Sequence, residues 1–380
     1  MNYSLPEETL ILQETVRRFV ENELIPLEQE LPDRSNSFQL PEKLHAELTA
    51  KVREMGLAAR DVPEDAGGAG LGALDNCVIT EQVHRSTAGC GVFGSNFASM
   101  LYELGTDEQK EKYMFPAIQG KFHGASAFSE PQSGSDMAGT RTTIEKTNDS
   151  WAINGNKCWI FRANTARFIL VLTRVKGTER HEGLQWVIVD AGMPGFKVGR
   201  EQKMIHGQNT YELFFDNCVV GEEQMLGKMG EAWSSGTNFL FAGRIQIAAR
   251  ALGIADRCLA MATEYAKTRH TFGKVLSSRQ AIQWMIANSA MELHAARLIV
   301  YDAASRAQAG EQVFAQTAMA KVVATEMAAK VVDRAIQIHG AAGVSDDTIL
   351  ERCYRDVRPM RIYEGTSEAM RSVIARDLLK

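Results

Sequence analysis

The 380-residue chain lacks long hydrophobic runs, an excess of basic charge and closely paired cysteines. No apolar segment approaches the roughly 20 residues that a membrane-spanning helix needs. The net charge of −5 offers neither a basic stripe for nucleic acid nor a polybasic anchor for acidic lipid. The sequence therefore predicts no nucleic-acid partner and no membrane partner.

The six cysteines are scattered without a CxxC pair, and the eight histidines include no HExxH motif. This pattern argues against a disulfide framework and against a zinc site, so we expect no metal. The start of the chain is acidic and lacks the charged and apolar regions of a signal peptide. These features predict a bacterial cytoplasmic protein, or a mitochondrial matrix protein if a transit peptide has been removed.

The length exceeds the roughly 250–300 residues at which a single core stops growing, so two or three domains are expected. Residues 1–120 are mainly helical in pattern, with Val16, Phe19 and Val20 on one apolar face. Residues 121–230 are rich in β-branched and aromatic residues, and residues 231–380 return to a helical pattern. We predict a mainly α protein with a central β domain, and not a doubly wound parallel sheet.

The central region carries several short β signals. Asn154-Gly155 lies between two β-rich segments and predicts a hairpin within residues 151–160. Further strands of a small antiparallel sheet are expected at Phe168–Thr173, Leu184–Val189 and Tyr211–Phe215. In the helical C-terminal region, Gln316–Ile338 is apolar around much of its circumference, which indicates a helix buried in a bundle or between subunits.

Three segments could carry chemistry, although each also has a purely structural interpretation. The Ser- and Gly-rich segment Phe128–Asp136 could bind an anion or simply form a turn. Arg269–Gly273 could bind a pyrophosphate or end a helix at the surface. Glu364 in Arg361–Glu368 could be a partly desolvated general base or a solvated helix cap. By contrast, the glycine-rich stretch Gly68–Gly72 follows no strand and is interpreted as a loop.

The order and spacing of these segments around a β-rich middle resemble the acyl-CoA dehydrogenase family along essentially the whole chain. The resemblance implies an N-terminal helical domain (1–120), a middle antiparallel β-barrel or sandwich domain (121–230) and a C-terminal four-helix bundle (231–380). It also implies FAD as cofactor, an acyl-CoA substrate, a homotetramer built as a dimer of dimers, and an electron-transferring flavoprotein as partner.

Matched position by position, the resemblance makes Glu364 the catalytic base that removes the α-proton while a β-hydride passes to flavin N5, leaving a trans-2-enoyl-CoA. The implied substrate contacts are Arg244, Tyr363 and Gly365. The implied cofactor contacts are Phe128, Ser129, Ser135, Trp159, Phe161, Arg269, Thr271, Gln280, Gln337, Gly340, Ala341 and Thr366. Some relatives carry the base just before the bundle arginine, but Gly243 occupies that position here and leaves room for Glu364.

Two departures from the family pattern bear on the substrate. Phe161 replaces a Thr near flavin N5, and Phe241 replaces the usual Asp or Asn three positions before Arg244. An apolar wall at both points would suit a bulky cyclic or branched acyl group. Two other departures are Ala341 in place of Gly or Ser, and Glu368 in place of Gln or Asn near the FAD diphosphate.

Two alternatives remain open at the level of sequence. The same fold could serve a flavin oxidase that uses oxygen, as acyl-CoA oxidases do, since function depends on the site. The nitroalkane oxidase branch fits less well because its base is Asp where this chain has Glu364. A non-catalytic relative that binds acyl-CoA is a third interpretation, against which Glu364, Arg269 and Gln337 argue.

Overall fold

The computed structural model describes residues 5–30, 40–94 and 97–380, which form two compact units. The first unit combines residues 1–41, 72–91 and 240–380, and the second combines residues 42–71 and 92–239. The sequence-based division into three domains stays a prediction, because this partition groups the N-terminal helices differently.

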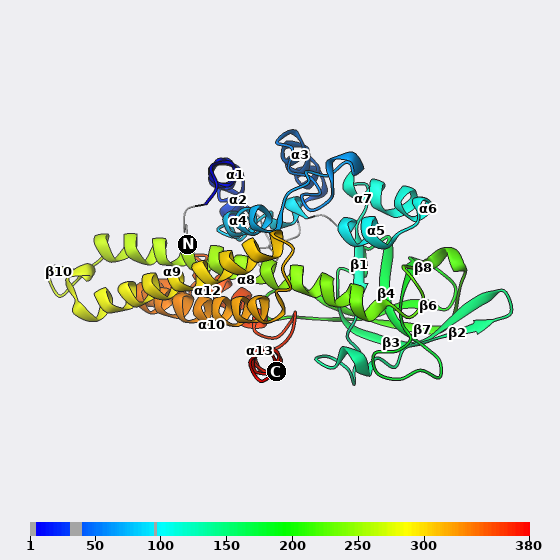
Figure 1. Cartoon of the computed structure of the whole chain (residues 1–380). Helices are drawn as coiled ribbons and strands as arrows, with labels where there is room; N and C mark the ends of the chain where they lie inside the picture. Colours follow the sequence, from blue (N-terminus) through cyan, green and yellow to red (C-terminus); the bar gives the residue numbers. More distant parts are fainter. Residues whose placement is uncertain (1–4, 31–39, 95–96) are drawn as a thin grey trace. The chain divides into compact units, whose positions relative to one another are not determined.

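The first unit is helical, and its long helices are labelled in Figure 1. Most of its elements come from the C-terminal half of the chain. Its helices are α1 (Glu7–Phe19), α2 (Leu27–Glu30), α4 (Ala73–Val83), most of α8 (Ala232–Thr268), α9 (Gln280–Gln308), α10 (Phe314–His339), α11 (Ala341–Val344), α12 (Leu350–Met360) and α13 (Ser367–Leu378). A two-stranded hairpin, β9 (His270–Thr271) with β10 (Lys274–Val275), joins α8 to α9.

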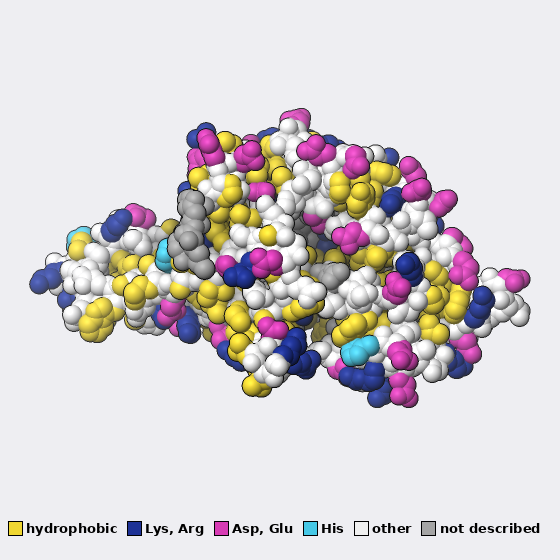
Figure 2. All heavy atoms as spheres, viewed as in Figure 1, with side chains coloured by type: hydrophobic (Ala, Val, Ile, Leu, Met, Phe, Trp, Pro, Cys, Tyr) yellow, Lys and Arg dark blue, Asp and Glu magenta, His cyan; other side chains and the backbone are white. Residues whose placement is uncertain are grey.

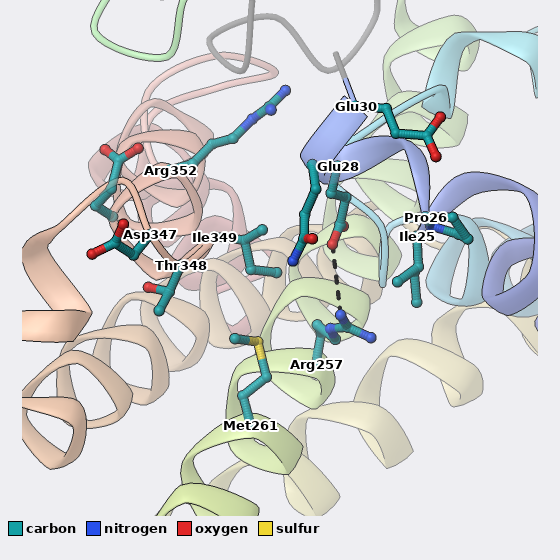
Figure 3. Close-up of a pocket in the computed structure, with 12 residues that line it drawn as sticks. Ile25, Pro26, Glu28, Glu30, Arg257, Met261, Asp347, Thr348, Ile349 and Arg352 are labelled. Carbon is teal, nitrogen blue, oxygen red and sulfur yellow. Dashed lines mark ion pairs between the residues drawn. The ribbon is translucent and has the colours of Figure 1, made fainter. Parts of the chain in front are cut away.

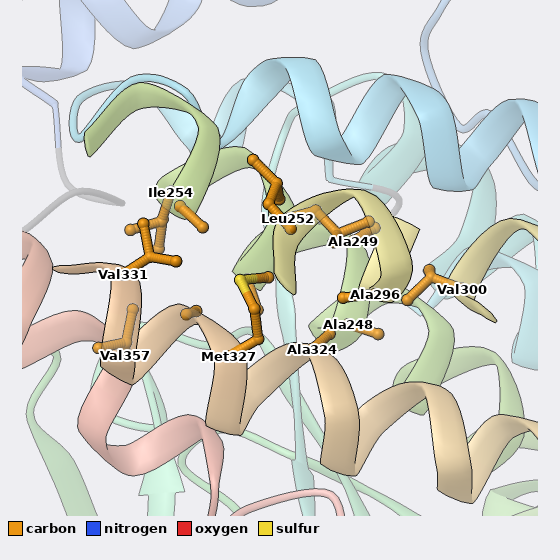
Figure 4. Close-up of a cluster of buried hydrophobic side chains, with 14 of the residues drawn as sticks. Ala248, Ala249, Leu252, Ile254, Ala296, Val300, Ala324, Met327, Val331 and Val357 are labelled. Carbon is orange, nitrogen blue, oxygen red and sulfur yellow. The ribbon is translucent and has the colours of Figure 1, made fainter. Parts of the chain in front are cut away.

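Small residues let the long helices of this unit pack closely. Figure 4 shows Ala248 and Ala249 of α8 beside Ala296 of α9 and Ala324 of α10, all fully buried. Short side chains at such contacts allow the helix axes to approach to about 8 Å. The predicted buried helix at 316–338 is therefore confirmed as α10, which ends at Gly340 with φ +63°.

The described part of the second unit contains an eight-stranded sheet, several α-helices and the first residues of α8. Its helices are α3 (Glu42–Glu54), α5 (Ala98–Leu104), α6 (Asp107–Gln109) and α7 (Phe115–Ile118). Its strands are β1 (Gly124–Ala127), β2 (Thr143–Thr147), β3 (Ser150–Phe161), β4 (Phe168–Val175), β5 (Leu184–Asp190), β6 (Phe196–Gln202), β7 (Thr210–Val220) and β8 (Met225–Leu226). The strand order is β6-β7-β3-β2-β4-β5-β8, and β1 pairs with β4.

The predicted fold class, mainly helical with a central β domain, is confirmed, but the sheet is mixed. Strands β1 and β2 each pair with β4 in parallel, while all other pairings in this sheet are antiparallel. Central strands β4 and β5 are buried along nearly their whole length. Alternate residues serve two cores, with Ile169 on one face and Phe168 on the other.

The hairpin predicted at Asn154-Gly155 is wrong. Residues 150–161 form one continuous strand, and Gly155 with φ +145° lies at an irregularity in the pairing of β3 with β7. A Cβ at Gly155 would lie 2.7 Å from the Thr142 backbone, so the glycine is required by a close approach and not by a turn. The reversal occurs instead at Asn148-Asp149, between the paired residues Thr147 and Ser150.

Other local predictions agree with the structure. The strands predicted at 168–173, 184–189 and 211–215 lie within β4, β5 and β7, and residues 67–72 form a loop. None of the helices in the described ranges is both long and apolar enough to cross a membrane. On the face drawn in Figure 2, acidic and basic side chains are interspersed.

Candidate active site

The segment that carries Glu364 is a tight loop between α12 and α13. Glu364 has φ +55° and Gly365 has φ +93°, so two successive residues adopt positive φ values. A positive φ is costly for a residue other than glycine, and such strain persists only where the surroundings impose it. On the far side of the loop, Thr366 accepts a hydrogen bond from the Ala369 N–H at 3.2 Å and caps α13.

Glu364 lies against α8 where that helix carries a glycine. A Cβ added at Gly243 would lie 2.9 Å from Glu364 Oε2, so any larger residue there would displace the carboxylate. The prediction that Gly243 leaves room for Glu364 therefore agrees with the geometry. Oε2 itself is buried, and no residue in the described ranges donates a hydrogen bond to it.

The electrostatic surroundings of Glu364 suit a general base. Burial raises the pKa of Glu364 above its usual range, while the positive charges of Arg244 and Lys321 oppose this rise. Burial likewise lowers the pKa of Arg244, which is only 8% exposed. The result is a carboxyl group whose pKa is raised by burial and whose charged form is opposed less strongly because two cations act on it.

The backbone N–H of Glu364 remains available to a ligand. Within the described part of the chain, no group accepts a hydrogen bond from it. Glu364 lies in the loop between α12 and α13, so its N–H is not part of a helix. A thioester carbonyl could accept this hydrogen bond while its α-carbon faces the base.

An aromatic wall flanks the two charged groups. Phe241 on α8 packs edge-to-face against Phe314 at the start of α10, with ring centroids 4.5 Å apart. The Arg244 guanidinium lies 5.3 Å from the centre of the Phe241 ring. Arg244, Tyr363, Glu364 and Gly365 are thus brought together as predicted, and Phe241 lies beside them.

Another group of predicted residues lies elsewhere in the same unit. Thr271 belongs to the β9–β10 hairpin, and its carbonyl accepts a hydrogen bond from Arg279 at 2.5 Å. Gln337 is exposed near the end of α10, sixteen residues beyond Lys321, which corresponds to about 24 Å along the helix. The residues of this group, all exposed except Thr271, are Arg269, Thr271, Gln280, Gln337, Gly340 and Ala341. They do not converge on Glu364 within one chain.

In the second unit, a buried ion pair stabilises the predicted loop Phe128–Asp136. Lys157 Nζ donates to the Phe128 carbonyl at 2.9 Å and to Glu130 Oε1 at 2.8 Å, and both charged side chains are fully buried. The Phe128 ring packs edge-to-face on Trp186 at 4.8 Å, and the Ser129 carbonyl accepts a hydrogen bond from the Cys158 N–H. The outer end of the loop, including Ser135, is exposed.

Trp159 presents a flat aromatic surface next to this loop. Its φ is +63° within an irregular stretch of β3, its N–H donates to Gln202 Oε1 at 3.0 Å, and its side chain is 55% exposed. An exposed aromatic ring beside a loop rich in serine and glycine fits the isoalloxazine of FAD. Phe161, at the end of the same strand, is half-buried.

A separate pocket of about 500 Å³ in the first unit contains none of the predicted site residues. Figure 3 marks the ion pair between Arg257 and Glu28, whose charged atoms are 3.6 Å apart, with Thr348 and Arg352 also lining the pocket. Burial raises the pKa of Glu28, although a hydrogen bond from Thr87 and the charge of Arg257 oppose the rise. The pocket wall therefore contains one ion pair, Glu28 with Arg257, among several further charged side chains.

Sequence reasoning missed Lys321, Lys157 and Glu130. The signal for Lys321 was present, since this lysine is the one charged residue in the apolar run of residues 318–324. Lys157 lies in a β-rich run, where nothing in the sequence indicated that it points inward to Glu130. Both lysines are almost completely removed from solvent.

Comparisons with known proteins agree along the whole chain. Family models described as the N-terminal, middle and C-terminal domains of acyl-CoA dehydrogenase match residues 6–121, 125–218 and 231–379. The chain is 36% identical to the short-chain specific acyl-CoA dehydrogenase of Rattus norvegicus mitochondria, over 99% of this chain and 91% of that protein. It is also 36% identical to (R)-benzylsuccinyl-CoA dehydrogenase of Thauera aromatica, over 100% and 97%.

The fold comparison gives the same picture. The structure of butyryl-CoA dehydrogenase from Megasphaera elsdenii superimposes with a TM-score of 0.90 at 31% identity, and the match covers 100% of both chains.

Proposed function

Because the chain belongs to the acyl-CoA dehydrogenase family, we propose that it oxidises a bulky acyl-CoA thioester with Glu364 as its base. The family identifies it as an FAD-dependent oxidoreductase that acts on a CH–CH bond. The observation that carries the finer proposal is the position of Glu364, with a buried carboxylate between Arg244 and Lys321 and its own N–H free.

The proposed chemistry follows from this arrangement. The thioester oxygen accepts the Glu364 N–H, which stabilises negative charge as the α-carbon loses its proton. The Glu364 carboxylate takes that proton, and its raised pKa makes it a stronger base than an exposed glutamate. FAD supplies the acceptor for the electron pair that leaves with the β-hydrogen as hydride. The product is then a trans-2-enoyl-CoA.

The acyl group is proposed to be cyclic, aromatic or branched. The edge-to-face pair Phe241–Phe314 lies next to Arg244 and offers an apolar surface beside the base. Aromatic rings pack favourably on such a surface. The similarity to a benzylsuccinyl-CoA dehydrogenase, whose name describes an aryl-substituted acyl group, supports this substrate class.

We propose a homotetramer in which Arg269, Thr271, Gln280 and Gln337 serve the FAD of a neighbouring subunit, with an electron-transferring flavoprotein as acceptor. The distance along α10 between Gln337 and the base segment supports the first part, because one chain cannot gather both groups around one flavin ring. An apolar stripe on α9 supports it further: Trp284, Met291 and Leu298 recur every seven residues and are 60%, 62% and 37% exposed.

The experiment that tests the function is an anaerobic titration of the purified flavoprotein with straight, branched and aryl-substituted acyl-CoAs. Loss of the flavin's blue absorbance with the bulky class, absent in Glu364→Gln, is the expected result. Phe241→Asn should shift preference toward straight chains. Absence of bleaching by every thioester would overturn the proposal, and rapid reoxidation of the reduced flavin by air would favour an oxidase.

A further inference from the structure

A lysine without solvent contact lies directly behind the base segment. Lys321 belongs to the first half of α10 and is 0% exposed. Its Nζ donates a hydrogen bond to the Gly365 carbonyl at 2.5 Å. Burying an ammonium group is costly unless it is hydrogen-bonded and its charge is compensated, so the position of Lys321 needs an explanation.

The carbonyl that Lys321 holds belongs to the residue that follows the base. Gly365 has φ +93°, and a Cβ at this position would lie 2.5 Å from Met370 Cε, so the backbone is pressed against α13. Fixing the Gly365 carbonyl limits rotation of the segment that carries both the Glu364 carboxylate and the Glu364 N–H. Both groups must meet the same substrate at hydrogen-bond distance.

The charge of Lys321 acts on Glu364 as well. Among the described residues that influence the Glu364 carboxyl, Arg244 comes from α8 and Lys321 from α10. The charges that act on Lys321 are, in decreasing order of effect, those of Glu364, Arg244, Glu368 and Glu326. On the other side of the loop, Tyr363 faces Arg250 and Asp356. The carboxyl thus has two cationic neighbours, and Lys321 is one of them.

We propose that Lys321 is a positioning residue for the base: it fixes the Glu364–Gly365 segment through the Gly365 carbonyl and, with Arg244, supplies positive charge near the Glu364 carboxyl. This inference rests on the proposed function of Glu364. Lys321 contacts neither the substrate carbonyl nor the reacting carbons; it acts through Glu364.

The protonation state of Lys321 is consistent with this role. Burial lowers the pKa of Lys321 to about 8, with Glu364 foremost among the charges that oppose the decrease. The side chain is therefore mainly a cation at neutral pH. Without it, Arg244 alone would oppose the burial of Glu364, and the pKa of Glu364 would rise further.

The test separates proton removal from electron transfer. The FAD-loaded protein is mixed with a 3-thiaacyl-CoA, whose α-proton is acidic but whose β position is sulfur and has no hydrogen to transfer. Formation of the bound enolate is followed by its long-wavelength charge-transfer absorbance between pH 5 and 9. The variants are Lys321→Met, which loses both donor and charge, Lys321→Gln, which keeps a donor, and Lys330→Met, an exposed lysine on the same helix.

In Lys321→Met the acidic limb of enolate formation should move to higher pH, and the rate at pH 6 should fall on the order of 10²-fold, as misplaced catalytic groups cause. Lys321→Gln should show the pH shift with a smaller loss of rate. Lys330→Met should match the unmodified protein. A merely structural role would lower stability without moving the acidic limb.

The outcomes distinguish the two proposals. One outcome is that the unmodified protein, Lys321→Met and Lys321→Gln all form the enolate and lose it at the same acidic pH. In that case the inference about Lys321 is wrong, while the proposed function stands. If the unmodified protein never forms the enolate, Glu364 is not an acyl-CoA base and both proposals are overturned.

Discussion

Each unit contains a buried lysine near a buried carboxylate, but the two arrangements differ in what the charges contact. In the second unit, Lys157 and Glu130 form a direct ion pair at 2.8 Å. In the first unit, Lys321 donates to a backbone carbonyl and reaches Glu364 only through its electrostatic field. The lysine and the glutamate therefore bond directly to each other in the second unit, whereas in the first unit they do not.

The consequences appear in the carboxyl pKa values. Burial would raise the pKa of Glu130, but Lys157 and hydrogen bonds from the Arg141 and Thr142 N–H groups outweigh it and lower the pKa. Glu364 has no such donors in the described structure, and burial keeps its pKa raised. A satisfied carboxylate rigidifies a loop, whereas an unsatisfied one retains the basicity that proton abstraction requires.

The largest effect is expected for Glu364→Gln. Removal of a general base typically costs about 10²–10⁴-fold in rate, which the half-reaction with the preferred acyl-CoA would measure. The conservative substitution Glu364→Asp should retain part of the activity, because it shortens the base without removing it. Equal rates for Glu364→Gln and the unmodified protein would contradict the assignment.

The same substitution should affect stability in the opposite direction. Because the folded-state pKa of Glu364 is raised, the folded protein binds more protons than the unfolded chain between the ordinary glutamate pKa and the raised pKa, and stability falls as the pH rises through that window. Glu364→Gln should therefore unfold at higher temperature than the parent above the raised pKa, with the difference vanishing at low pH. Glu130, with its lowered pKa, should show the reverse dependence.

The next effect is expected for Lys157→Met. The substitution leaves Glu130 buried without its cation, which typically costs about 3–5 kcal/mol in the free energy of unfolding. A denaturation curve followed through tryptophan fluorescence would measure it, with the exposed Lys197→Met as control. The double variant Lys157→Met/Glu130→Gln should recover part of the loss, and failure to do so would mean that the pair is not coupled.

A smaller loss is expected for Lys321→Met. The Gly365 carbonyl loses its donor, which costs about 1–3 kcal/mol, but no fully buried ion pair is broken. Comparison with Lys157→Met in the same denaturation assay tests whether the free energy of unfolding depends less on Lys321 than on Lys157. A loss as large as that of Lys157→Met would remove the distinction between the two pairs.

The smallest change in stability is expected for Gly243→Ala. Alanine in place of glycine within α8 favours the helix by up to about 1 kcal/mol. The added Cβ would approach Glu364 Oε2 to 2.9 Å, so the carboxylate must shift and the rate of proton removal should fall. A more stable and less active protein is the expected combination; unchanged activity would show that the base tolerates displacement.

Much of the fold could be read from local patterns. Apolar residues at helical spacing predicted α1 and α10, and β-rich runs predicted β4, β5 and β7. These patterns exist because the buried residues of an element recur at its structural period. The Asn154-Gly155 hairpin failed because the same dipeptide also suits a strand irregularity, and only the close approach of Thr142 decides between the two. The parallel pairings of β1 and β2 with β4 could not be predicted either, because they join segments far apart in the chain.

The sequence by itself determined the family, the order of the elements and the chemical types of residue around Glu364. Only the tertiary structure decided which charges compensate one another. Lys157 and Glu130 are 27 residues apart, and Lys321 lies 44 residues from Gly365, so no local sequence pattern predicts either contact. The pKa of a carboxyl depends on burial and on neighbours within a few ångströms, and those are properties of the packed chain.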